Sequence, residues 1–171
     1  MRLFGITGWK NSGKTTLMVN IVSELRRRNY SVATIKHAHH EFDIDQPGKD
    51  SFRHRTAGAS QVIVASSKRW ALVKELDQQP EPTLDQLLAK LDPVDFVIVE
   101  GFKRSPHPKL AVVRPDHNAE PLPDAEPLLA LASDQSINAI DYGCNGPVFP
   151  LTDVKQICDF IVENANNDFS A

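Results

Sequence analysis

Residues 8–15, with the sequence GWKNSGKT, combine the residue types that could hold the phosphates of a nucleotide. They match the pattern GxxxxGK[ST] at every fixed position. Gly8 and Gly13 would let the backbone turn tightly and bring its N–H groups against phosphate oxygens. Lys14 would bridge the terminal phosphates, while the Thr15 hydroxyl would hold a Mg²⁺ ion that neutralises them. The spacing therefore predicts a nucleoside triphosphate site.

The flanks of this loop predict the order strand, loop, helix. Residues 3–7 (LFGIT) are typical of a short strand, and residues 16–28 place Leu17, Ile21 and Leu25 on one helical stripe. The loop would then lie at a helix N-terminus, where unpaired N–H groups and the helix dipole favour an anion. Residues 31–36 (SVATIK) predict a second, parallel strand, which completes a βαβ unit.

The rest of the chain alternates in the same way, which predicts an α/β fold of the P-loop NTPase type: a mostly parallel sheet flanked by helices, with an added hairpin or sheet extension. We expect one nucleotide-binding domain over residues 1–171, with 165–171 as a frayed tail. Trp70 is expected to be packed, with an interface role as the alternative. The further strands are expected at 61–66, 70–73, 94–102, 109–114 and 128–132, and the further helices at 51–58, from 83 to before Pro93, and at 153–164.

Two acids of the apolar run at residues 94–102 compete to be the carboxylate linked to Mg²⁺. Asp95 begins the expected strand and Glu100 ends it, so they lie about 16 Å apart and only one can be near the phosphates. The phosphate loop follows the carboxyl end of a parallel strand, which favours Glu100 as the residue that holds the metal or its water. Pairing of Glu100 with Lys103 or Arg104 is the structural alternative.

Residues 36–50 (KHAHHEFDIDQPGKD) form a long polar loop that leaves the carboxyl end of a strand. Three interpretations compete: a transition-metal site that uses His37 and His39 with Asp43 or Asp45, a solvated loop without a role, and a ligand-binding loop. We favour the third. In it Asp43, Asp45 or Asp50 supports Mg²⁺ or its waters. Lys36, Lys49 and the histidines, among them His37, meet a second phosphorylated ligand.

Asp134 follows the expected strand at 128–132. A carboxylate there could accept hydrogen bonds from N1 and N2 of guanine and so select the base. The sequence lacks the NKxD pattern, and Asp134 could instead only cap a turn.

Composition is that of an ordinary soluble protein, with a net charge of −3 that gives no electrostatic case for nucleic-acid binding. We see neither a secretory signal nor a membrane span, and we expect a cytoplasmic protein. Cys144 and Cys158 lack metal-like spacing, and no disulfide between them is expected. Cys158 is expected in a helix core.

Five segments in order resemble the family of molybdopterin-guanine dinucleotide biosynthesis adapter proteins. They are GWKNSGKTTL, IKHAHH with DIDQPGKDS, AGA with IVASSKRWAL, IVEGFK and LALASD, so that the resemblance covers nearly the whole chain except residues 116–127. The resemblance implies a GTP-binding protein with weak GTPase activity, a homodimer in the cytoplasm, working beside the guanylyltransferase that joins GMP to molybdopterin. The family's nucleotide residues fall on Gly8, on Asn11, Ser12, Gly13, Lys14, Thr15 and Thr16, and on Glu100; its other motifs fall on residues 36–40 and 47–51.

The residues and the resemblance together predict a Mg²⁺-dependent GTP-binding adapter with slow hydrolysis, in which Lys14 and Glu100 are the catalytic residues. Slow turnover fits a loop without an evident arginine finger, where Lys10 is the nearest extra cation. Two alternatives remain open. One is a small-molecule kinase that uses ATP, with Arg53 or Arg55 as part of a lid, and the other is a scaffold with a structural nucleotide.

Overall fold

Strand β1 (Arg2–Gly8) carries the chain into the phosphate loop, and helix α1 (Lys14–Arg27) follows that loop. The computed structural model describes residues 1–38, 42–117 and 120–166. Contacts divide the chain into a first unit, residues 1–37 with 84–171, and a second unit, residues 38–83. Each unit is described by itself, and the expected single domain over residues 1–171 stays a prediction.

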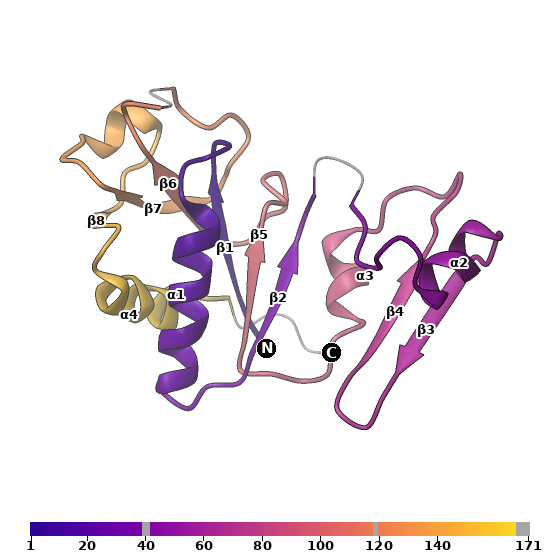
Figure 1. Ribbon diagram of the computed structural model, residues 1–171. Coiled ribbons are helices and arrows are strands. Elements are labelled where there is room, and N and C mark those ends of the chain that lie inside the picture. Colours follow the sequence, from indigo (N-terminus) through magenta and orange to yellow (C-terminus); the bar gives the residue numbers. More distant parts are fainter. Residues whose placement is uncertain (39–41, 118–119, 167–171) are drawn as a thin grey trace. The chain divides into compact units, whose positions relative to one another are not determined.

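The first unit is built on a six-stranded parallel sheet with β1 inside it (Figure 1). The strand order is β2-β5-β1-β6-β7-β8, and every neighbouring pair is parallel. Besides β1, the strands are β2 (Val32–Lys36), β5 (Phe96–Glu100), β6 (Lys109–Val113), β7 (Leu128–Ser133) and β8 (Val148–Pro150). The predicted α/β fold is confirmed. Strand β5 lies between the two strands of the predicted βαβ unit.

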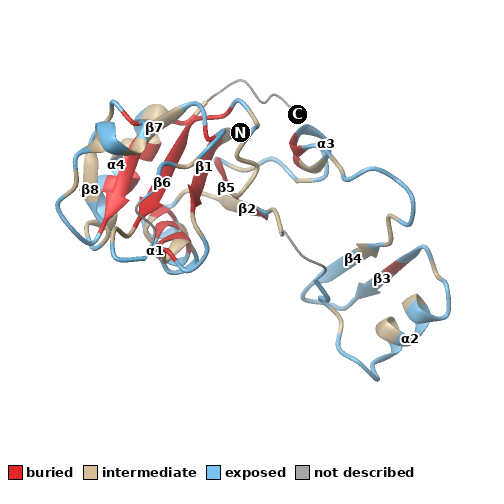
Figure 2. Cartoon of the chain, turned by 90° about the horizontal axis from the view of Figure 1, so that it is seen from above, coloured by how far each residue is buried: buried red, intermediate tan, exposed pale blue. Residues whose placement is uncertain are grey.

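Alternation along the buried strands separates the core into two faces. On one face Phe4, Ile6 and Ile98 pack under α1 and α4 (Val154–Asn164). On the other face Leu3 and Val97 pack with helix α3 (Leu84–Leu88), and the 3₁₀ helix η1 (Ala139–Tyr142) covers residues of β6 and β7. Buried residues therefore follow β1, β5, β6 and β7 in Figure 2. Because both faces are covered, these strands are apolar on both sides.

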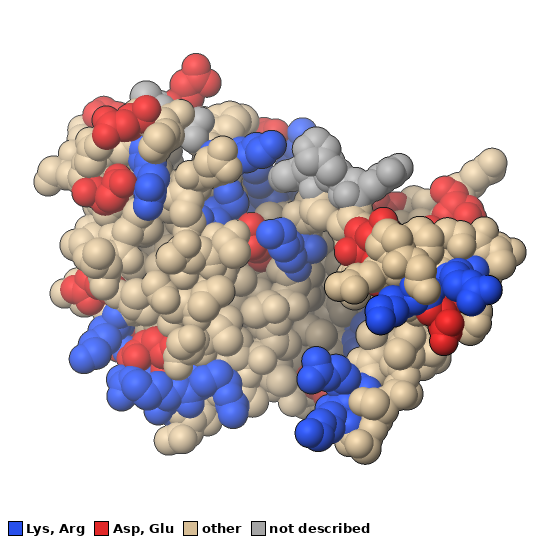
Figure 3. Space-filling model, in the orientation of Figure 1, with Lys and Arg blue, Asp and Glu red and all other residues tan. Residues whose placement is uncertain are grey.

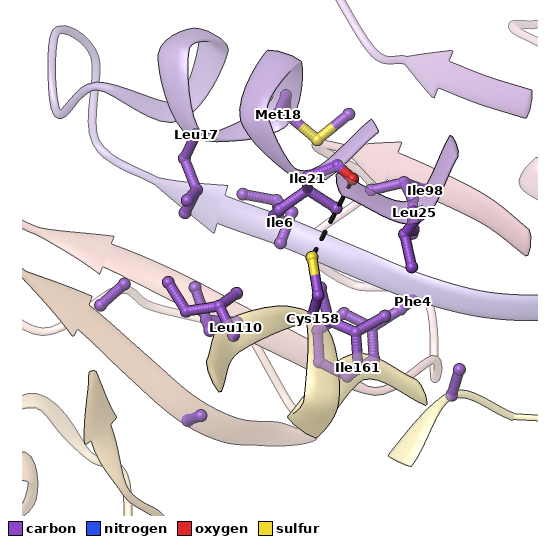
Figure 4. Packing of buried hydrophobic residues seen from close by; sticks show 14 of the residues in the cluster. Phe4, Ile6, Leu17, Met18, Ile21, Leu25, Ile98, Leu110, Cys158 and Ile161 are labelled. Carbon is purple, nitrogen blue, oxygen red and sulfur yellow. Dashed lines mark hydrogen bonds between the residues drawn. The ribbon is translucent and has the colours of Figure 1, made fainter. Parts of the chain in front are cut away.

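Cys158 belongs to this core, as expected from the sequence. Figure 4 shows its side chain pointing from α4 to α1, where Sγ lies 3.9 Å from the carbonyl oxygen of Ile21. Burial raises the pKa of the Cys158 thiol to about 12. Cys144 is buried too, and both cysteines are free thiols.

The ends of the two long helices follow the rules for capping and charge. Asp153 accepts a hydrogen bond from the backbone N–H of Gln156 and so caps α4. In the last turns of α1, Arg27 and Arg28 form ion pairs with Glu24. Figure 3 shows basic side chains gathered where α1 ends. Cations at this helix end suit the negative end of the dipole.

The second unit contains a hairpin of β3 (Gln61–Ala65) and β4 (Trp70–Lys74), with α2 (Asp50–Thr56) packed on β3. The hairpin forms a sheet of its own and does not extend the six-stranded sheet. Val62 on the α2 side is buried, whereas Trp70 is 69% exposed. The prediction that Trp70 is packed is wrong, because a two-stranded sheet with one short helix covers only one of its faces.

The structure differs from the sequence-based expectation in the length of one helix, in one additional strand and at the start of the expected tail. Helix α3 ends at Leu88, earlier than expected, and β8 was not predicted. Asn166, assigned to the frayed tail, exchanges backbone hydrogen bonds of 3.0 and 3.1 Å with Leu3. Residues 167–171 of that tail lie outside the described part. No helix in the described residues is long and apolar enough to cross a membrane.

Candidate nucleotide site

Helix α1 begins in a way that leaves its N–H groups available. Gly13 is the N-cap residue and adopts the left-handed conformation, with φ of 96°. Within the described residues no side chain caps this end, and the first turn contains no acid. The first N–H groups of a helix need partners and carry its positive dipole end. This helix end is therefore suited to an anion.

Close packing explains the two glycines of the motif. A Cβ atom at Gly8 would lie 2.6 Å from the carbonyl oxygen of Val112 and 2.9 Å from Ser12 Oγ, at a φ of 146°. A Cβ atom at Gly13 would lie 3.3 Å from Nη2 of Arg114. Only glycine lets the loop take this path beside β6.

Two buried hydroxyl groups border the loop without a partner. Thr7 Oγ1 and Ser12 Oγ have no hydrogen bond to the described residues, although both side chains are about fully buried. Buried polar groups almost always have partners, and such an orphan marks a place where a ligand or ion belongs. The two unpartnered hydroxyl groups are therefore consistent with a phosphate group at this loop.

Lys14 is held inside its own loop. Its Nζ donates a 2.6 Å hydrogen bond to the carbonyl oxygen of Trp9. Burial lowers the pKa of Lys14, the neighbouring charges of Lys103 and Lys36 lower it further, and Glu100 opposes them. Lys14 and Glu100 are thus close enough for their charges to interact.

Glu100 and Asp95 lie at opposite ends of β5, as predicted. Ile6 near the end of β1 is opposite Glu100, which ends β5 beside the phosphate loop. Asp95 accepts hydrogen bonds of 2.7 Å from both the backbone N–H and the hydroxyl of Ser31. Asp95 therefore fixes a turn, and Glu100 is the acid at the loop edge.

Glu100 does not pair with Lys103 or Arg104 in the described structure but with Lys36 at 3.5 Å. Lys103 instead lies over the ring of Trp9, 5.3 Å from its centroid, and Arg104 pairs with Asp124. The Glu100 side chain is only 12% exposed. The charges of Lys14, Lys36 and Lys103 and the largely buried carboxylate of Glu100 therefore lie close to one another beside the loop.

A Mg²⁺ ion fits these residues chemically. Thr15 is exposed in the first turn of α1, and Glu100 offers carboxylate oxygens, which are the ligands that Mg²⁺ prefers. Thr16 and Asn11 are exposed as well, and Asn11 helps to turn the loop with φ of 63°. These residues could hold the ion together with phosphate oxygens.

The residues that follow β2 lie at the same sheet edge. The backbone N–H of His37 donates to the carbonyl oxygen of Glu100 at 2.8 Å, and the His37 ring stacks on Phe102 with centroids 4.7 Å apart. A Cβ atom at Gly101 would lie 2.7 Å from His37 Cβ. Gly101, the residue after Glu100, thus leaves space for His37.

Asp134 follows β7 at this edge, in the position that sequence analysis gave to the base-selecting residue. Its Oδ2 lies 3.4 Å from Nε of Arg114, which directly follows β6. The geometry is that of an ion pair, because Nε makes no hydrogen bond to the described residues. Both side chains remain partly exposed, at 36% for Arg114 and 40% for Asp134.

The other predicted site residues lie in the second unit. Arg55 forms ion pairs with Asp45 at 2.8 Å, with Asp43 at 2.7 Å and with Glu75 at 3.3 Å. Asp45 is 7% exposed and already has a cation for partner. The Arg55 guanidinium is therefore already paired with carboxylates of its own unit, and these acids raise its pKa.

Lys49 and Asp50 lie at the start of α2. Lys49 is the N-cap residue, and Asp50 is in the first turn. In the described residues no group of three or more His, Cys, Asp or Glu side chains forms a metal site. His39, which the transition-metal interpretation required, lies outside the described residues.

Sequence analysis gave no role to two residues at the loop, Arg114 and Trp9. Arg114 lies against Gly13, so the structure adds a cation beside the loop to Lys10. Trp9 donates from Nε1 to the carbonyl oxygen of Glu120 at 3.0 Å. A usable signal existed for Arg114, because a charged residue directly after an apolar parallel strand lies at the ligand edge of the sheet.

Comparisons with known proteins show the family to which this chain belongs. The family model described as molybdopterin guanine dinucleotide synthesis protein B matches residues 3–134. The chain is similar to the molybdopterin-guanine dinucleotide biosynthesis adapter protein of Haemophilus influenzae, with 40% identity over 163 residues that cover 93% of this chain and 86% of the relative. Similarity to the adapter protein of that name from Escherichia coli is 38% over 165 residues, 94% of this chain and 91% of the relative.

A solved structure is similar over the same extent. The crystal structure of a MobB protein homolog from Bacillus stearothermophilus covers 95% of this chain and 97% of its own, with a TM-score of 0.69 and 26% identity.

Proposed function

Because the chain belongs to the molybdopterin guanine dinucleotide synthesis protein B family and is an adapter of that biosynthesis, we propose that it binds GTP with Mg²⁺, hydrolyses it slowly and assists the attachment of GMP to molybdopterin. The observation that carries the nucleotide part is the phosphate loop. Its glycines, orphaned hydroxyls and uncapped helix end gather beside Lys14 and Glu100.

The roles of the chain's own residues follow from their positions. Loop N–H groups and Lys14 would stabilise negative charge on the phosphates, which is the main contribution a protein makes to phosphoryl transfer. Thr15 and Glu100 would hold Mg²⁺, which neutralises phosphate charge when it is bound. Asp45 is a weaker candidate for the metal because it already pairs with Arg55.

Preference for guanine is assigned to Asp134. Its position after β7 supports this assignment, since the carboxyl ends of β1, β5, β6 and β7 meet at one edge of a parallel sheet. Its carboxylate would accept hydrogen bonds from N1 and N2 of the base. Lys36 and His37, at the same edge, are proposed to meet a phosphate of molybdopterin, with Lys49 as a further candidate.

The proposed partners are the molybdenum cofactor guanylyltransferase and a second copy of this chain. One surface suits a second copy: Ile63, Trp70 and Leu72 share the hairpin face away from α2 and are 66%, 69% and 44% exposed. Apolar residues clustered on one exposed face are typical of protein interfaces.

A kinase that uses ATP remains the competing function. That hypothesis uses Arg53 or Arg55 as part of a lid over the phosphates. Arg55, however, forms ion pairs with three carboxylates of its own unit. That pairing removes one reason for the kinase hypothesis.

Reconstitution of the biosynthetic step tests the adapter function. Purified guanylyltransferase would receive molybdopterin, GTP and Mg²⁺, with wild-type protein, with Lys14→Ala or with Lys90→Ala, a substitution at an exposed lysine outside the loop. We expect wild-type and Lys90→Ala to increase the yield of molybdopterin guanine dinucleotide, and Lys14→Ala to lose that increase. A yield that does not respond to the wild-type protein would contradict the proposal.

A further inference from the structure

Arg114 is placed beside the phosphate loop by its strand. It directly follows β6, whose Val112 is opposite Gly8 of β1, so it leaves the sheet at the same edge as the loop. An atom built as Cβ on Gly13 would lie 3.3 Å from Nη2 and 3.6 Å from both Cζ and Nε. The guanidinium group therefore lies flat against the backbone at the first turn of α1.

One donor of Arg114 has no hydrogen-bond partner among the described residues. A guanidinium has five N–H donors in a fixed fork. Nε is buried and makes no hydrogen bond to the described residues, although Asp134 Oδ2 is 3.4 Å away. Arg28 of the same unit, in contrast, donates to Glu24 at 2.8 Å and is fixed on the helix surface.

The neighbours of Asp134 do not compete for Arg114. Gln135 donates from its side chain to Asp116, and its backbone N–H donates to the hydroxyl of Ser133. Among the described residues, the ion pair given for Asp134 is the one with Arg114. A carboxylate at this distance holds the arginine in place without saturating it.

Strand order fixes which part of a nucleotide Arg114 would meet. Glu100 lies on the β5 side of β1, whereas Arg114 lies on the β6 side and Asp134 one strand further, on β7. If Asp134 meets the base, as in the proposed function, then Arg114 lies between the base and the loop. The phosphates nearest the nucleoside are the ones within its range.

On this basis, and resting on the proposed function, we propose that Arg114 is a nucleotide-binding residue that contacts the phosphates nearest the nucleoside, with Asp134 as its positioning partner. Arginine suits this position because its planar fork can bind two phosphate oxygens at once. The assignment differs from an arginine finger, which acts on the terminal phosphate. It also gives Gly13 a second reason to be glycine, since a side chain there would displace the guanidinium.

A purely structural role is the competing explanation. Arg114 could only support the loop backbone at Gly13. In that case its removal would weaken GDP and GTP only through a destabilised loop, and the melting temperature of the nucleotide-free protein would fall together with the affinity.

Titration of guanosine, GDP and GTP, each with Mg²⁺, separates the two roles. The variants are Arg114→Met, which keeps the length of the side chain without its charge, Arg114→Lys, and Arg104→Met as control at an arginine that is 86% exposed. Guanosine, the weak ligand, is measured by competition with a fluorescent GDP analogue. Thermal melting checks that each variant is folded.

We expect Arg114→Met to weaken GDP and GTP by a similar factor of about ten or more, the usual effect of a charged hydrogen bond, and to leave guanosine within about twofold. Arg114→Lys should recover part of the loss, and Arg104→Met should have no effect. The inference is overturned if folded Arg114→Met binds GDP as the wild type does, if guanosine weakens as much as GDP, or if the loss of GDP affinity comes with a melting temperature of the nucleotide-free protein that is lower than that of Arg104→Met. If the wild type binds neither GDP nor GTP, the proposed function fails first and this inference with it.

Discussion

Lys14 donates a 2.6 Å hydrogen bond to the carbonyl oxygen of Trp9, so the cation of the phosphate loop is held by the loop itself. The Lys14 ammonium has three N–H donors, so it can keep this bond beside Trp9 and still offer donors to phosphates. Trp9 is also tied to Glu120 and lies near Lys103. A nucleotide bound at Lys14 would therefore change the charges close to the Trp9 indole ring.

Trp9 fluorescence should report nucleotide binding. Trp70 is the second of the two tryptophans, and Trp70→Phe leaves Trp9 as the sole emitter. We expect GTP to change the emission of Trp70→Phe, and the change to disappear when Lys14→Ala is added, since loss of a charged phosphate contact weakens binding about tenfold or more. In the matched protein Trp9→Phe, Trp70 should give no signal; a signal there would assign the change to the second unit.

Gly8 should be far less replaceable than another glycine with a positive φ that has open space around it. Gly8→Ala combines a φ of 146° with a contact of 2.6 Å to the Val112 carbonyl, whereas Gly143→Ala has a φ of 72° and nothing within 4 Å. Backbone strain alone costs about 1 kcal/mol, and forced overpacking adds about 1–3 kcal/mol. Urea denaturation should show the larger loss of unfolding free energy for Gly8→Ala. Equal losses would mean that the loop moves freely away from β6.

A buried histidine should make the fold sensitive to acid. His107 is 1% exposed, and neither ring nitrogen has a hydrogen-bond partner in the described structure. Burial, aided by the charge of Lys109, lowers the pKa of His107 to about 3 from 6.5. The unfolded chain therefore binds a proton that the folded chain does not, so stability is full above pH 6.5 and falls as the pH decreases toward 3.

His107→Gln removes this titration and should flatten the profile. Between about pH 6 and pH 4 the unfolding free energy of the wild type should fall faster than that of the variant, by up to about 1.4 kcal/mol per pH unit. Urea titrations at each pH measure both slopes. Parallel profiles would show that folding does not lower the pKa of His107.

The hairpin face should control assembly. We expect the wild type to have about twice the mass of one 19.0 kDa chain by light scattering, and Trp70→Ser with Leu72→Ser to shift it toward the monomer. Loss of buried apolar area weakens association by about 25 cal/mol per Å². Ile140→Ser is the control, since Ile140 is 70% exposed but lies outside the hairpin. A dimer that survives the double substitution would place the interface elsewhere.

Much of the first unit could be predicted because local patterns determine it. The GxxxxGK[ST] match places Gly13 at a helix start, and the apolar run that ends in Glu100 identifies a buried strand. The choice of Glu100 over Asp95 needed only strand direction and rise, and the structure places both residues as expected.

Other features depend on which distant segments meet, and sequence patterns do not show this. Arg114 contacts Gly13 because β6 is the neighbour of β1, and this pairing joins segments about a hundred residues apart. Asp45 was assigned to metal because its partner Arg55 lies ten residues away in a different element. Trp70 was expected to be packed because its apolar strand resembles a core strand, but the sheet has only two strands.

Calorimetric titration with GTP and with ATP, each with Mg²⁺, tests the central claim most directly. The ratio of the two affinities is compared between the wild type and Asp134→Ala, because the ratio cancels any effect on phosphate binding through Arg114. We predict that the wild type prefers GTP about tenfold or more and that Asp134→Ala loses most of this preference. Tighter binding of ATP, or a preference unchanged by Asp134→Ala, would contradict the account.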